Sequence, residues 1–133
     1  MYATLISSIE NLFASATWTA ANIAIYPDNY QGTISDQNEF CRLNILPASG
    51  TTQDHNGKKT LSGTVIVTMY VKAGEGQRRV SAIADTLDTL LEHKYPTSGL
   101  GLGASFVTIG GLDSQNSALY TAQYIIPFTY YED

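Results

Sequence analysis

The chain is poor in cysteine, in charge and in long apolar runs, and each scarcity excludes a class of protein. Cys41 is the only cysteine among 133 residues, so the sequence allows no internal disulfide and no Cys-based metal site. Its place in an alternating apolar run predicts a buried, unreactive thiol. Charged residues make up 14% of the chain, against about 25% in average globular proteins. Much of the surface must therefore be uncharged and polar, and such surfaces often contact other protein.

The charge that is present is mostly acidic, with 7 lysines and arginines against 12 aspartates and glutamates. This balance argues against a broad phosphate-binding surface and against nucleic acid as a direct ligand. No apolar run approaches the ~18 residues of a membrane-spanning helix, and no basic segment followed by an apolar one opens the chain. We therefore expect no membrane contact and no signal peptide. The length suits one domain, which we expect to span residues 1–133.

Groups that could carry catalysis or bind a metal are few. His55 lies in a polar segment without partners, and His93 falls at the end of a predicted helix, where its side chain suits the carbonyl end. Asp85, Asp88 and Glu92 recur along the same helix and could bind a divalent cation, but such a stripe is more often a solvated helix face. The sequence therefore predicts no enzyme, no metal and no cofactor.

One stretch, from Thr60 to Tyr95, organises the rest of the chain. Its first half alternates between polar and apolar residues, which predicts a strand with one dry face. That face holds Leu61, Gly63, Val65, Val67, Met69 and Val71. After a turn at Gly74-Glu75-Gly76, apolar residues recur at spacings of three and four, which predicts a helix lying on a sheet. Its stripe holds Val80, Ile83, Ala84, Leu87, Leu90, Leu91 and Tyr95.

The segments before this stretch add one helix and two strands. Helical spacing predicts a helix from Tyr2 to Ala14, and short apolar runs predict strands over Trp18 to Tyr26 and Phe40 to Leu46. Pro47 to Lys59 is almost wholly polar, so we expect a long loop at 47–59 between two antiparallel strands.

The segments after it add a connector and two strands. Pro96 to Gly103 is a Gly-rich connector. It is not a phosphate-binding loop, because it precedes a strand and no Lys-Ser/Thr pair follows it. Ala104 to Gly110 is predicted as a strand with Val107 and Ile109 inside, and Leu119 to Tyr130 as the last strand, where Pro127 indicates a sheet edge or a bulge. The predicted fold is α+β, a mainly antiparallel sheet covered by two helices, in the order α-β-β-β-α-β-β.

Two features suggest contact with another protein. Arg78 and Arg79 stand in the first turn of the long helix, where the helix dipole disfavours cations. Either Glu75 compensates them or they grip a neighbour. The last strand is rich in tyrosine, a residue enriched at protein interfaces, although packing beneath the helices also explains several rings. The candidate interface residues are Gln53, Asp54, His55, Asn56, Lys58, Lys59, Arg78, Arg79 and Tyr130.

The succession of segments resembles the tail-terminator, or tail-completion, proteins of long-tailed bacteriophages. The resemblance spans residues 5–130 and rests on the order of the segments. They are Ile23-Ala24-Ile25-Tyr26-Pro27-Asp28-Asn29, Asn38-Glu39-Phe40-Cys41-Arg42-Leu43, Ser62-Gly63-Thr64-Val65-Ile66-Val67, Ala73-Gly74-Glu75-Gly76 with the helix at Ala82-Ile83-Ala84-Asp85, and Tyr124-Ile125-Ile126-Pro127-Phe128.

The resemblance implies a non-enzymatic virion protein of the tail or neck, assembled in the host cytoplasm. Such proteins form a ring, commonly a hexamer, on the head-proximal end of the tail tube. The ring ends tube polymerisation and provides the docking surface for the head-completion protein. The implied partners are other copies of the chain, the tail tube protein and the head-completion protein, with DNA passing through the lumen without specific binding.

Two alternatives stay open at this point. The chain could be another head-tail joining component, such as a head-completion, stopper or tube protein. It could also be a monomeric module that holds a small ligand or peptide on its tyrosine-rich strand.

Overall fold

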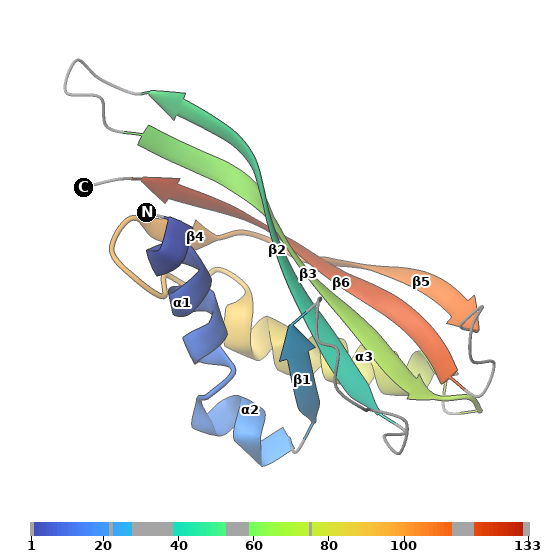
Figure 1. Cartoon of the computed structure of the whole chain (residues 1–133). Coiled ribbons are helices and arrows are strands. Elements are labelled where there is room, and N and C mark those ends of the chain that lie inside the picture. Colours follow the sequence, from blue (N-terminus) through green and yellow to red (C-terminus); the bar gives the residue numbers. More distant parts are fainter. Residues whose placement is uncertain are drawn as a thin grey trace.

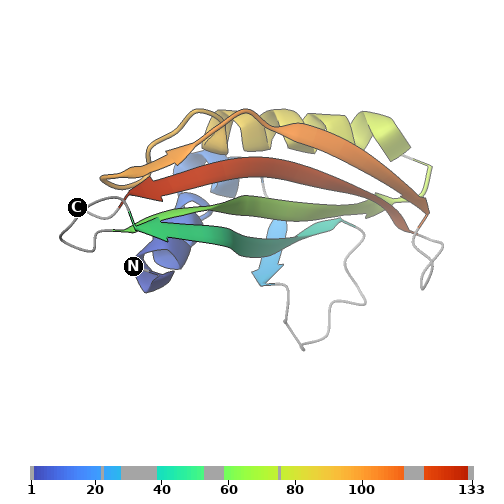
Figure 2. The same cartoon turned by 90° about the horizontal axis from the view of Figure 1, so that it is seen from above.

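A single twisted sheet with all its helices on one face makes up the described part of the chain (Figures 1 and 2). In this computed structural model the described residues are 2–21, 23–27, 39–52, 59–74, 76–112 and 119–131. The helices are α1 (Tyr2–Leu12), α2 (Ala16–Ala21) and α3 (Gly76–Leu91). The strands are β1 (Ala24–Pro27), β2 (Phe40–Thr52), β3 (Lys59–Lys72), β4 (Leu100–Leu102), β5 (Phe106–Leu112) and β6 (Leu119–Tyr131).

The sheet has the order β1-β2-β3-β6-β4, and β5 pairs with β6 beyond the end of β4. Every pairing is antiparallel except that of β1 with β2, which is parallel. The predicted α+β class with a mainly antiparallel sheet is therefore confirmed. The helices number three among the described residues instead of the predicted two, because α2 occupies part of an expected strand.

The strand, turn and helix predicted from Thr60 onward form the centre of the molecule. Val65, Val67, Met69 and Val71 are fully buried on the inner face of β3, and every apolar residue of the α3 stripe is buried against it. Gly74 and Gly76, which lie where β3 gives way to α3, adopt positive φ angles that favour glycine.

Tyr95 does not belong to the helical stripe, and that prediction is wrong. Helix α3 ends at Leu91, and His93 lies beyond it with a left-handed φ of 57° instead of in the last turn. The amide of His93 donates to the carbonyl oxygen of Gly103 at 3.2 Å, and the amide of Leu102 donates to Lys94 at 2.9 Å. The chain is thus tied back to β4 after the helix, which leaves Tyr95 exposed.

Trp18 lies in helix α2, so the predicted strand over Trp18 to Tyr26 is wrong in its first half. Alanine is the best helix former and opens and closes this short segment at Ala16 and Ala21. The indole packs edge-on against Phe13, with ring centroids 5.1 Å apart, and both rings are buried. Only Ala24–Pro27 forms a strand.

The β2–β3 hairpin is longer than predicted. Its ladder runs from Phe40 paired with Tyr70 to Thr52 paired with Lys59, so residues 47–52 and Lys59 belong to strands. Polar side chains do not prevent strand pairing, because backbone groups form the ladder. A bulge between Pro47 and Ser49 accommodates the proline. The remainder of the expected loop, Gln53 to Lys58, lies outside the described residues.

The glycine-rich connector contains an edge strand. Leu100 and Leu102 of β4 are buried in the core, which the connector prediction missed.

Pro127 lies in β6, an interior strand, and not at an edge or bulge as predicted. Its carbonyl accepts the Gly103 amide at 2.9 Å, at the break between β4 and β5. The proline therefore lies where no neighbouring strand requires its missing donor.

Truncation of Leu87 tests the packing of α3 on the sheet. Leu87 is fully buried, so Leu87→Ala should lower the free energy of unfolding by about 2–5 kcal/mol through lost burial and a cavity. Urea denaturation measures the change. The matched control is Asp85→Ala on the exposed side of the same helix, which should change stability by less than about 0.5 kcal/mol. Equal effects of the two would contradict this packing.

Candidate subunit interface

No described helix covers the sheet face opposite the helices (Figure 1). The residues that the strands place on this face are almost all uncharged. Its side chains alternate with those of the core along each strand. The strand pairing places on it Asn44, Leu46, Ser62, Thr64, Ile66, Thr68, Thr121, Gln123, Ile125, Thr129, Phe106 and Thr108. Among the described positions of β2, β3, β5 and β6 on this face, only Arg42 and Lys72 carry charge. This matches the uncharged polar surface that the composition predicts.

A row of apolar side chains crosses this face to the β5 edge. Ile66 pairs with Ile125, and Ile125 pairs with Phe106, so the three lie side by side across β3, β6 and β5. Directly opposed apolar side chains in neighbouring strands stabilise one another. The row ends at the outermost strand with Phe106, whose ring is exposed to solvent.

Strand β5 is an apolar edge strand. The exposed fractions are 57% for Phe106, 40% for Val107, 42% for Ile109 and 59% for Leu112. The prediction that Val107 and Ile109 lie inside is therefore wrong, because β5 is the outermost strand and α3 does not cover it fully. Natural edge strands are usually protected by lysine, proline or a bulge. Residues 106–112 contain no charge and no proline, and carry only the bulge between Ile109 and Gly111.

A polar cluster fastens the start of β5 to α3. The Ser105 hydroxyl donates to Asp88 at 2.5 Å and lies 3.1 Å from Glu92, and the Ser105 amide donates to Glu92 at 2.8 Å. The Tyr124 hydroxyl donates to the same Asp88 oxygen at 2.6 Å. Burial, and then the hydrogen bond to Asp88, raise the pKa of Tyr124 well above its usual range. These bonds attach the chain to α3 at Ser105, the residue that precedes β5.

This cluster corrects the interpretation of the acidic stripe as a solvated face. Asp88 and Glu92 are half-buried and bonded, and only Asp85 is exposed. In the part of the chain that the structure describes, no three side chains of the metal-binding types gather.

The opposite edge of the sheet is formed by β1 and β2. Strand β1 pairs with β2 only from Phe40 to Leu43, so within the described residues the outer side of β2 lacks a strand partner from Asn44 onward. Leu46 is exposed there. Strand β2 pairs with β3, β3 pairs with β6, and β6 pairs with β5, each time antiparallel. Strand β2 therefore runs opposite to β5. The two edges can therefore pair antiparallel between copies.

Of the predicted interface residues, only Arg78, Arg79 and Tyr130 have described side chains. Gln53, Asp54, His55, Asn56 and Lys58 lie outside the described residues, as does the side chain of Lys59, which opens β3.

The two arginines at the start of α3 differ from each other. Arg79 forms a two-bond ion pair with Glu39, with Nε–O and N–O distances of 2.6 and 2.5 Å, so Glu39 offsets its charge. Arg78 is exposed. Tyr130 lies in the core with 9% exposure, at the opposite end of β3 from the arginines, since it pairs with Leu61.

Sequence reasoning missed the exposed residues of β5. The signal that was available is the run of seven residues without charge, Phe106–Leu112. The alternation pattern placed only Val107 and Ile109 of this run inside.

Comparison with known proteins supports the fold. No protein-family model matches the sequence, and no curated protein matches it. A solved structure whose name states no function aligns with 98% of this chain and 95% of its own, at a TM-score of 0.64 and 16% identity. At this identity the likeness concerns the fold alone.

Among the described residues, no helix has both the length and the apolar character to cross a bilayer.

Removal of the Ser105 hydroxyl tests the attachment of β5. Ser105→Ala leaves Asp88 without one donor, and should lower the free energy of unfolding by about 1–3 kcal/mol. Amide hydrogen exchange should quicken first in Phe106–Leu112. Ser81→Ala, on the exposed side of α3, is the control and should leave exchange in β5 unchanged. Uniform acceleration over the whole sheet would contradict a local anchor.

Proposed function

We propose that the protein is a ring-forming structural subunit that caps the head-proximal end of a bacteriophage tail tube. In this proposal the ring ends tube polymerisation and receives the head-completion protein. The observation that carries the self-assembly is the exposed, uncharged edge strand β5. An unpaired apolar edge invites pairing with another chain, so a stable protein that retains one needs a partner for it. The phage assignment rests on the resemblance of the sequence to tail-terminator proteins.

A ring requires two different contact surfaces on each copy, because head-to-tail contacts close into a circle only when surface A of one copy meets surface B of the next. The β5 edge supplies one such surface. The outer side of β2 after Leu43 supplies the other, and antiparallel pairing between them would continue the sheet from copy to copy. The weakly charged open face would then continue around the ring.

A charge placed on the β5 edge tests the proposal. Ile109→Lys should weaken each contact by about 2 kcal/mol or more, roughly 30-fold, because a lysine would have to be buried between copies. Light scattering should show a ring for the unchanged chain and a monomer for the variant. Electron micrographs should show caps on one end of tail tubes only with the unchanged chain.

The matched control is Ser81→Lys, which adds the same charge on the solvent side of α3. This variant should form rings and cap tubes as the unchanged chain does. A persistent monomer of the unchanged chain in the presence of tubes would contradict the proposal.

Cross-linking distinguishes a ring from a two-fold dimer. Asn44→Cys on β2 and Thr108→Cys on β5, combined in one chain and treated with a short bis-maleimide, should give a ladder of covalent oligomers that ends at the ring size. The native Cys41 is fully buried, so the unchanged chain is the control and should not cross-link. Covalent dimers alone, formed equally by the Thr108→Cys single variant, would indicate that β5 pairs with itself.

A further inference from the structure

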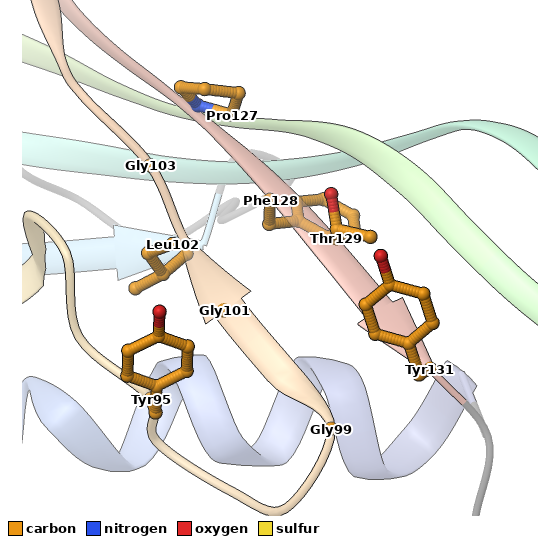
Figure 3. Close-up of a pocket in the computed structure, with 9 residues that line it drawn as sticks. All are labelled: Tyr95, Gly99, Gly101, Leu102, Gly103, Pro127, Phe128, Thr129 and Tyr131. Atoms are coloured by element: carbon orange, nitrogen blue, oxygen red, sulfur yellow. The ribbon is translucent and has the colours of Figure 1, made fainter.

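An open hollow of about 500 Å³ lies on the uncovered sheet face at its β4 end (Figure 3). We refer to it as the tyrosine hollow. All its lining residues are uncharged. They are Tyr95, Gly99, Gly101, Leu102, Gly103, Pro127, Phe128, Thr129 and Tyr131.

Glycine backbone forms part of the floor of the tyrosine hollow. Gly101 faces the same side of the sheet as its β6 partner Thr129, away from the core side chains of β4. A Cβ on Gly101 would come within 3.0 Å of the Tyr95 ring, and one on Gly103 within 3.1 Å of the Pro127 ring. The glycines therefore let the rings lie close to the strand, which gives the run a role other than that of a connector.

Two tyrosine rings flank this floor. Tyr95 is 80% exposed and Tyr131 is 54% exposed, and Figure 3 shows them on either side of β4 with their hydroxyl groups directed the same way. Tyrosine combines an apolar ring with a hydroxyl that can donate a hydrogen bond, and is enriched where proteins bind one another. The arrangement suits an occupant with apolar ridges and hydrogen-bond acceptors, and it offers no charge to balance a charged ligand.

A peptide that adds as a further strand does not fit here. The amides of β4 that face away from β6 are already used, since Leu100 donates to Thr97 at 3.1 Å and Leu102 to Lys94 at 2.9 Å. Strand addition depends on free backbone groups at the edge. An occupant must therefore bind through its side chains and its own carbonyl groups.

We infer that the tyrosine hollow binds a proline-rich segment of another protein in the polyproline II conformation. Such a segment has no internal hydrogen bonds, and its prolines have no amide donor, so its backbone offers acceptors to the two tyrosine hydroxyls. Its pyrrolidine rings form the apolar ridges that aromatic-lined grooves bind, and its preformed helix loses little entropy on binding. This inference goes beyond the proposed function and does not depend on ring formation.

Fluorescence anisotropy with a labelled decaproline peptide tests the inference on the full chain. We expect saturable binding below about 1 mM, as for other weak peptide contacts. Tyr95→Ala and Tyr131→Ala should each weaken it at least about tenfold. Gly101→Val should abolish it, because a Cβ at this position comes within 3.0 Å of the Tyr95 ring and would displace that ring. Tyr95 is exposed, so its ring can move without unfolding, and circular dichroism should show an unchanged fold.

Ser81→Ala, on the exposed side of α3, is the control and should leave peptide binding unchanged. The inference is overturned if decaproline does not bind, or if a Gly-Ser peptide of the same length binds as well. It is also overturned if maltohexaose binds with the same variant losses, because the occupant would then be a sugar. If the chain assembles into a ring but does not bind decaproline, this inference is overturned and the proposed function is not.

Discussion

The packing of the α3 stripe against the inner side of β3 and β6 decides which surfaces of the molecule remain available. Because every described helix lies on that one side, the other face of a long sheet is left open (Figure 2). A sheet with one dry face commonly carries polar side chains on the other, and threonine, serine, asparagine and glutamine supply much of that polarity here without charge.

The periodic centre of the fold was predictable because both of its elements are long and strictly patterned. Val65 and Val67 belong to an alternation that runs over a full strand, and Leu87 belongs to an apolar stripe of four helical turns. Only one orientation of each element buries all of these apolar side chains. Val107 and Ile109 alternate just as well, but alternation does not reveal whether a helix covers a strand. Their exposure depends on where β5 lies in the sheet, which is a property of the topology.

The anchor of β5 shows why the candidate interface could not be predicted from sequence. Asp88 meets Ser105 from 17 residues away and Tyr124 from 36 residues away. On the helix alone, Asp88 and Glu92 have the spacing of a solvated face, and only the approach of two other segments makes them structural. The same holds for Arg79, whose partner Glu39 lies 40 residues earlier. The structural roles of these charged side chains therefore follow from tertiary contacts and not from the local sequence pattern.

In the proposed assembly, the exposed apolar edge of β5 pairs with another copy of the chain. Hydrogen exchange of the β5 amides that face away from β6, compared between dilute monomer and assembled protein, tests it most directly. If β5 pairs between copies, exchange of these amides in Phe106–Leu112 should slow on assembly, while exposed amides elsewhere are unaffected. Equally fast exchange of these amides in both states would contradict it.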